Sequence, residues 1–224
     1  MIPLKDNNPT SKFPVVTVGL VAINAAVFIY TGILGIGGEE LYARFALIPY
    51  NVITIGGTSG PILAAASFFT SQFLHAGFLH VAGNMLFLWI FGNNIEDRLG
   101  SFRFIIFYLL CGAIAAAAQI IPDPQSRIPM IGASGAVSGV MGAYLLEFPR
   151  ARVLTLIWIL FFIRLVWLPA FFIILYWAAL QVLLQLSSGG QSGGVAYMAH
   201  IGGFIAGLVL FKIFLLFGRK KAAL

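Results

Sequence analysis

The chain has 224 residues, of which 60% are hydrophobic and only 9% charged, and its formal net charge is +6. Soluble domains carry about 25% charged residues, so this composition excludes a soluble globular protein and indicates one polytopic membrane domain. The apolar runs are long and continuous rather than short and alternating, which favours membrane-spanning helices over a β-barrel.

In chain order, six apolar runs predict six spans. A short polar tail at 1–14 comes first and a basic tail at 218–224 comes last, so the helical domain is expected at 15–217. The first run has no obvious cleavage site and is interpreted as a retained span rather than a signal peptide. The predicted spans lie at about 15–34, 73–95, 102–121, 132–147, 170–186 and 195–217.

Most lysines and arginines fall on one side of the predicted spans. They precede the first run, separate the second from the third, follow the fourth and close the chain, whereas Arg44 and Arg127 fall in loops on the other side. This positive-inside pattern predicts that both termini are cytoplasmic. The basic residues therefore report orientation, and no binding of nucleic acid is expected.

Three further segments are not spans. The loop at about 35–70 is long and partly apolar, so we expect it to be associated with the membrane. Residues 153–168 are apolar but contain Arg164 and end at Pro169, which predicts an interfacial segment. Residues 187–194 are serine, glycine and glutamine only and predict a flexible loop.

The predicted fourth span is unusually short. From Gly132 to Glu147 it covers about 24 Å at roughly 1.5 Å per residue, whereas the hydrocarbon core is about 30 Å thick. Its first two turns consist of glycine, alanine, serine and valine, which suits close approach by neighbouring helices. Ser134, on its first turn, would then lie below the outer surface, where an irregular approach segment requires a water-filled cavity or a protein surrounding.

The polar groups inside the predicted spans are few. All seven acids fall in loops or at span ends, so a full Ser-His-Asp triad is not expected, and a proton-coupled transporter is disfavoured. His80 and Asn84 are four residues apart and share a helix face, whereas His75 falls roughly 140° from His80. His80, Ser134 and His200 all lie in the outer halves of their spans, so they can converge.

Together these residues fit peptide-bond hydrolysis. Ser134 can be the nucleophile and His200 its base, while His80 and Asn84 can donate to an oxyanion. The start of the fourth helix adds backbone N–H groups and a positive dipole end.

Simpler interpretations exist for each residue alone. A serine or histidine in a span often only bonds its neighbours, and the pair Gly203 and Gly207 indicates close helix packing. A three-histidine metal site is disfavoured because His75 and His80 diverge and no carboxylate or cysteine lies nearby. We therefore expect neither a metal nor a cofactor.

Four motifs in this order resemble the rhomboid family of intramembrane serine proteases, in its prokaryotic six-span form. They are His75-x4-His80-x3-Asn84, Gly92-x3-Glu96-x3-Gly100, Gly132-Ala133-Ser134-Gly135 and Ala199-His200-x2-Gly203-x3-Gly207. The resemblance implies an all-α membrane protein: a six-transmembrane-helix rhomboid bundle with a short central fourth helix and a long membrane-associated first loop.

The resemblance also implies roles for these residues. Ser134 would be the nucleophile and His200 its base, and His80 and Asn84 would serve the oxyanion together with the Ser134 N–H. Gly203 would let the sixth span approach the fourth, and Glu96 would hold the cytoplasmic loop. The chain departs from some members in placing Ser138 where they have a tyrosine stacked on the histidine.

The implied activity is that of a serine endopeptidase in a lipid bilayer, expected in a prokaryotic plasma membrane with the active site open to the outer side. Its substrates would be single-pass or other transmembrane proteins, cut in or near a helix weakened by glycine or proline. They would enter past the fifth span, with loop 187–194 as a cap. The alternatives are a catalytically silent relative that binds transmembrane clients and a small transporter or channel.

Overall fold

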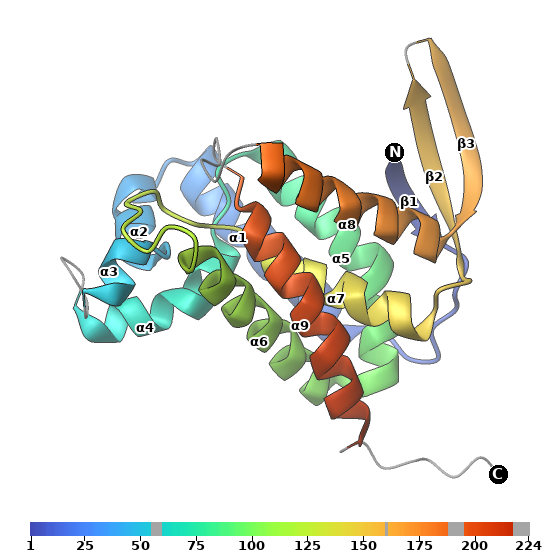
Figure 1. Ribbon diagram of the computed structural model, residues 1–224, viewed down its shortest axis with the longest axis horizontal. Coiled ribbons are helices and arrows are strands. Elements are labelled where there is room, and N and C mark those ends of the chain that lie inside the picture. The colour runs from blue at the N-terminus through green and yellow to red at the C-terminus, as the bar shows by residue number, and fades with distance from the viewer. Residues whose placement is uncertain (55–59, 160, 188–194, 217–224) are drawn as a thin grey trace.

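The computed structural model describes residues 1–54, 60–159, 161–187 and 195–216 of the chain. These residues form a mostly helical bundle with a small β-sheet at one end (Figure 1). The predicted basic tail at 218–224 and loop residues 188–194 lie outside the described residues.

Four helices of the described chain are long and apolar enough to cross a membrane. They are α1 (Val15–Phe28) with its π-helical continuation (Ile29–Ile33), α6 (Ser101–Ile120), α8 (Ala170–Ser187) and α9 (Tyr197–Leu216). Helix α5 (Phe78–Leu99) is a further candidate when it is joined to the preceding helical segment, from which it is bent by 82°. The chain is therefore an integral membrane protein, and the number of six spans stays a prediction.

Helix α7 (Ser134–Glu147) occupies the middle of the bundle, where it packs against α5, α6 and α9 (Figure 1). It has 14 residues, about 21 Å at roughly 1.5 Å per residue. It therefore begins two residues later than predicted, and Ser134 is its first residue. All positions from 135 to 144 are buried, which agrees with a helix that neighbours surround on every side.

Glycines bring the backbones of α7 and α9 together. A Cβ atom on Gly203 would collide with the carbonyl oxygen of Gly135, and one on Gly207 with that of Gly139. Gly135 is itself packed against the side chain of Ala115 on α6. This contact places His200, less than one turn before Gly203, beside the start of α7.

The described part of the long first loop is structured and holds the segment that leads to Ser134. It contains α2 (Gly38–Phe45), α3 (Pro49–Ile53) and α4 (Pro61–Thr70), followed by a 3-10 turn (Ser71–Phe73). Leu47 and Met130 exchange two backbone hydrogen bonds of 3.1 and 2.7 Å, and Tyr50 N–H donates to the Ser126 carbonyl. The contact of this loop with lipid stays a prediction.

Glu96 ties the ends of three helices together. Its side chain is 2% exposed and accepts hydrogen bonds from the backbone N–H groups of Val16 and Thr17 at the start of α1. The hydroxyls of Thr17 and Ser101 also donate to it, at 2.8 and 2.7 Å. Glu96 thus supplies partners for the otherwise unpaired first turn of α1 and links α1 and α5 to the start of α6.

The chain is mostly helical, as predicted, but it also forms a three-stranded antiparallel sheet that the sequence does not predict. Strand β1 (Ile2–Asp6) pairs with β2 (Arg152–Ile159), and β2 pairs with β3 (Phe162–Pro169). The sequence instead predicts a polar tail and an interfacial segment at these positions. The hairpin segment is apolar at nearly every position, so the alternating pattern that indicates a strand is missing.

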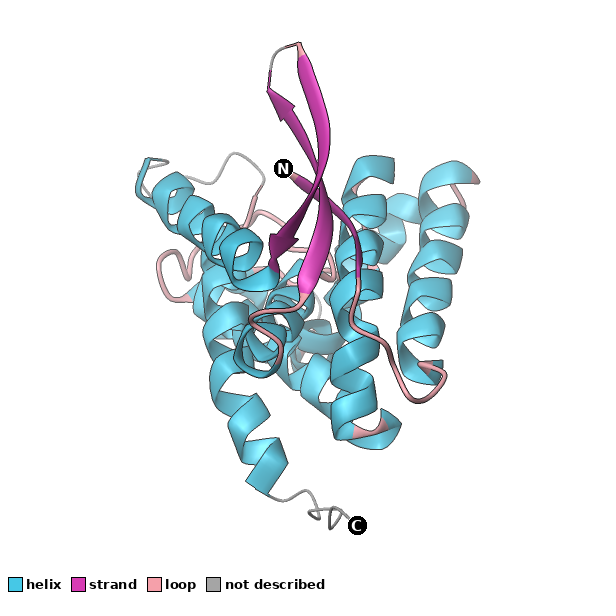
Figure 2. Ribbon diagram, turned by 90° about the vertical axis from the view of Figure 1, so that its right-hand side faces the viewer, coloured by secondary structure: helices cyan, strands magenta, loops and turns pink. Residues whose placement is uncertain are grey.

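Beyond Arg152 at its base, one face of the β2–β3 hairpin is apolar: Leu154, Leu156 and Trp158 on β2 lie opposite Trp167, Leu165 and Ile163 on β3. Trp158 is 66% exposed and Leu165 59% exposed. The hairpin projects away from the helices, and its second strand runs directly into α8 (Figure 2). Because tryptophan concentrates at membrane–water interfaces, we expect this face to contact the headgroup region, as predicted for 153–168.

A quenching experiment tests the position of the hairpin. With Trp89, Trp167 and Trp177 replaced by phenylalanine, the fluorescence of Trp158 should be quenched by lipids brominated near the headgroup. A matched protein that retains only Trp177, inside the bundle, should be quenched less by the same lipids. Equal and weak quenching of both proteins would contradict the interfacial position.

Candidate active site

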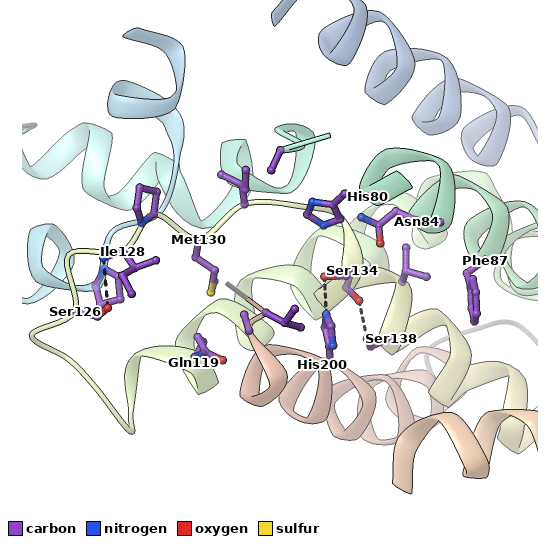
Figure 3. Close-up of a pocket in the computed structure, with 18 of the residues that line it drawn as sticks. His80, Asn84, Phe87, Gln119, Ser126, Ile128, Met130, Ser134, Ser138 and His200 are labelled. Carbon is purple, nitrogen blue, oxygen red and sulfur yellow. Dashed lines mark hydrogen bonds between the residues drawn. The ribbon is translucent and has the colours of Figure 1, made fainter. Parts of the chain in front are cut away.

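A cavity of about 1060 Å³ lies at the start of α7, where the sequence predicts a pocket (Figure 3). Helix α5 contributes His80 and Asn84 to its wall, α7 contributes Ser134, and α8 and α9 contribute Trp177 and His200. The structure thus gathers around one space the residues to which the sequence assigns nucleophile, base and oxyanion donors.

Ser134 and His200 are in hydrogen-bond contact. The Oγ atom of Ser134 lies 2.8 Å from Nε2 of His200 (Figure 3, dashed line). The glycine contacts between α7 and α9 produce this distance, because they let the two backbones approach without intervening side chains. This is the geometry that general-base activation of a serine requires.

The far side of the His200 ring has two partners, both on α8. Its Nδ1 lies 2.8 Å from Oε1 of Gln181, and the ring centre of Trp177 lies 5.8 Å away at an interplanar angle of 40°. Ser138 does not contact the ring; its hydroxyl donates to the Ser134 carbonyl at 2.6 Å. Trp177 thus makes the aromatic contact with His200 that the resemblance found in the sequence assigns to a tyrosine at the position of Ser138.

Neither Gln181 nor Trp177 is among the site residues that the sequence predicts. The available signal was Gln181 itself, an uncharged polar residue in a largely apolar span, since such residues usually find a partner inside the bundle. It is 8% exposed in the structure.

Gly132 makes room for His80, one of the two predicted oxyanion donors. Its φ angle is +114°, a conformation that residues with a side chain rarely adopt. A Cβ atom here would lie 2.6 Å from Nε2 of His80 and 3.6 Å from Nδ2 of Asn84. Glycine is therefore needed both for the turn into α7 and for the close approach of His80 to the segment that precedes Ser134 (Figure 3).

Asn84 carries a donor with no partner. Its Nδ2 atom is buried and makes no hydrogen bond within the described part of the chain. An unpaired buried amide costs about 1–3 kcal/mol, so such groups usually have a functional reason. A substrate oxyanion in the cavity would provide the missing acceptor.

His75 lies outside the helix in which the sequence predicts it. It lies in the bend before α5, which begins at Phe78, so it does not share a helix with His80 and the expected angle of roughly 140° between them does not apply. The two rings are instead in contact, with centres 5.0 Å apart in an edge-on arrangement. His75 Nε2 accepts a long hydrogen bond of 3.4 Å from the Ala133 N–H, which supports the segment before Ser134.

The fold and this site define a helical membrane protein with a serine–histidine pair in a cavity. A model of the rhomboid domain matches residues 62–217, and the chain belongs to the rhomboid family. This family consists largely of serine intramembrane proteases, and the membership agrees with the resemblance found in the sequence motifs.

Curated relatives share the family. The chain is 28% identical over 159 residues to rhomboid protein 1, mitochondrial, of Saccharomyces cerevisiae, covering 66% of this chain and 41% of that protein. It is 32% identical over 143 residues to RHOMBOID-like protein 5 of Arabidopsis thaliana, covering 64% and 42%. Rhomboid protease GluP of Bacillus subtilis is 34% identical over 98 residues, covering 42% and 19%. The chain thus spans less than half the length of these relatives.

Proposed function

We propose that this protein is an intramembrane serine endopeptidase that cleaves transmembrane proteins with a Ser134–His200 dyad. The observation that carries the proposal is the 2.8 Å contact between Ser134 Oγ and His200 Nε2 inside a cavity. The name of the Bacillus subtilis relative, a rhomboid protease, supports the same activity.

In the proposed reaction, His200 Nε2 takes the proton of Ser134 as Oγ attacks the carbonyl carbon of the substrate peptide bond. The tetrahedral intermediate places a negative charge on the former carbonyl oxygen. His200 then gives the proton to the leaving amine as the C–N bond breaks. Water, activated by His200 in the same way, hydrolyses the acyl-enzyme and restores Ser134.

In this proposal, three donors would surround the oxyanion. They are the side chains of Asn84 and His80 and the backbone N–H of Ser134, which as the first residue of α7 has no partner within its helix. The positive end of the α7 dipole adds to this stabilisation. Donors that are already in place bind the charged transition state more strongly than the substrate, and this lowers the activation barrier of the reaction.

Replacing Asn84 with alanine should lower kcat by about 100- to 1000-fold with little change in KM, because one oxyanion donor is lost. The measurement is steady-state cleavage of a single-pass substrate in proteoliposomes. Asn93→Ala, the same change near the other end of α5, should stay near the wild-type rate. An Asn84→Ala variant with wild-type kcat would exclude this donor from the oxyanion site.

The proposed number of spans, the orientation in the membrane and the route of the substrate follow the sequence predictions. The domain would cross the membrane six times between 15 and 217, with both termini in the cytoplasm of a prokaryote and the cavity open to the outer side. Substrates would reach Ser134 from the lipid past α8, whose Trp177 lines the cavity. A helix must unwind locally to expose its carbonyl, so sites near glycine or proline are expected.

The test combines cleavage with active-site labelling. Purified protein in proteoliposomes should cleave a single-pass substrate that has a glycine in its helix, and a fluorophosphonate probe should label Ser134, identified by peptide mass spectrometry. Binding of the substrate without cleavage or labelling would instead support the alternative, a catalytically silent client-binding protein.

A further inference from the structure

We propose that Gln181 is a positioning residue for the proposed dyad: it fixes the tautomer and the orientation of His200. The inference rests on the proposed function and extends it, because a serine–histidine pair without an acid needs another way to keep the base aligned. Gln181 lies on α8, His200 on α9 and Ser134 on α7, so the three side chains join three helices.

The hydrogen bonds around Gln181 determine which way its amide faces. Its Nε2 lies 3.3 Å from the carbonyl oxygen of Trp177. A carbonyl oxygen only accepts, so the amide nitrogen must face it and donate. The other end of the amide, Oε1, therefore faces His200, at 2.8 Å from Nδ1.

The orientation of the Gln181 amide determines which ring nitrogen of His200 carries the proton. Because Oε1 has no hydrogen, Nδ1 must carry one and donate it. In the neutral ring Nε2 then has a free lone pair, directed at Ser134 Oγ at 2.8 Å. The whole series runs in one direction: Ser134 donates to His200, His200 to Gln181, and Gln181 to the carbonyl of Trp177. The opposite tautomer would place an N–H against the serine and remove its base.

A neutral amide suits this position better than a carboxylate would. Gln181 is 8% exposed, inside a helix that is a candidate membrane span, where an ionised carboxylate costs several kcal/mol. The amide oxygen accepts the same hydrogen bond without a net charge. When His200 becomes protonated during the reaction, Nδ1–H still donates to Oε1, and a bond from a charged donor is the stronger one. Trp177 limits tilting of the same ring, with centres 5.8 Å apart.

Three variants distinguish a loss of His200 orientation from a loss of folding stability. Gln181→Leu removes the acceptor, Gln181→Glu keeps an acceptor oxygen in either protonation state, and Gln185→Leu makes the first change one turn further along α8. We expect Gln181→Leu to lower kcat by about 10- to 100-fold with KM nearly unchanged, as the loss of one aligned hydrogen bond implies. Gln181→Glu should recover at least half of that loss on a logarithmic scale, and Gln185→Leu should stay within about twofold of wild type.

A spectroscopic measurement reads the tautomer directly. In ¹⁵N-histidine-labelled protein carrying Ser134→Ala, His200 should show a protonated Nδ1 and an unprotonated Nε2, since only Gln181 then sets the tautomer. Adding Gln181→Leu should shift both resonances towards the opposite tautomer or an average. This change would not follow from a general loss of stability, which denaturation of each variant measures separately.

The outcomes distinguish this inference from the function on which it rests. If Ser134→Ala abolishes cleavage but Gln181→Leu keeps both the wild-type kcat and the His200 tautomer, the role of Gln181 is overturned and the protease stands. If Gln181→Leu is slow with an unchanged tautomer and Gln181→Glu gives no recovery, the residue is only structural and the inference also fails. Cleavage that survives Ser134→Ala would overturn the protease itself, whatever Gln181 does.

Discussion

Ser134→Ala is expected to lower the cleavage rate by on the order of 10⁴-fold or more, because the proposed nucleophile that forms the acyl-enzyme is lost. His200→Ala should cost a similar factor, since Ser134 Oγ then loses the base that lies 2.8 Å away. The effects should not add: the double variant should be about as slow as either single one, because the two residues act as a unit.

The measurement is initial-rate cleavage of a single-pass substrate in proteoliposomes at saturating substrate. Ser138→Ala is the matched control, one turn along α7, because its hydroxyl bonds to the Ser134 carbonyl rather than to His200. It should retain activity within about tenfold. A Ser134→Ala variant with measurable turnover above the uncatalysed rate would show that the cavity holds a different nucleophile.

Of the substitutions proposed for this protein, Gly207→Ala is expected to lower the free energy of unfolding most. The three nearest atoms to the added Cβ are backbone atoms of Gly139, including its carbonyl oxygen, so no side-chain rotation can relieve the collision. Overpacking of this kind costs typically about 1–3 kcal/mol, and we expect the unfolding free energy to fall by roughly 3 kcal/mol because backbones must separate. Activity should fall too, since α9 carries His200 and α7 carries Ser134.

Gly19→Ala on α1 provides the control. It is the same chemical change in a helix interior, but nothing lies within 4 Å of the added Cβ. It should be neutral or slightly stabilising, because alanine favours a helix over glycine by about 1 kcal/mol in water. Denaturation in detergent micelles compares the two variants with wild type. Equal stability of Gly207→Ala and Gly19→Ala would show that the contact between α7 and α9 is less tight than the structure indicates.

Composition and pattern determined much of the architecture. Long apolar runs separated by proline, glycine and charge place α1, α6, α8 and α9 within a few residues of their positions, because a continuous apolar stretch in lipid has to form a helix. The run of small residues after Gly132 identified the short central helix, since a helix without bulky side chains is suited to contact on all sides.

The local sequence pattern does not predict the structure correctly where tertiary contacts determine it. His75 was assigned to the second span because its surroundings are apolar, but the chain bends by 82° there and α5 begins at Phe78. The β2–β3 hairpin was missed because it carries apolar residues on both faces, which hides the period of two. Pairing of β1 with β2 joins residues about 150 positions apart, and no local signal encodes such a contact.

The sequence by itself determined a membrane protein and the set of candidate residues Ser134, His200, His80 and Asn84, because residue type and helical spacing limit which groups can share a face. Only the tertiary structure decided what holds His200. Helix α8 is apolar on nearly all sides, so its sequence does not determine how it is rotated about its axis. Packing against α9 sets that rotation and directs Gln181 and Trp177 at the ring.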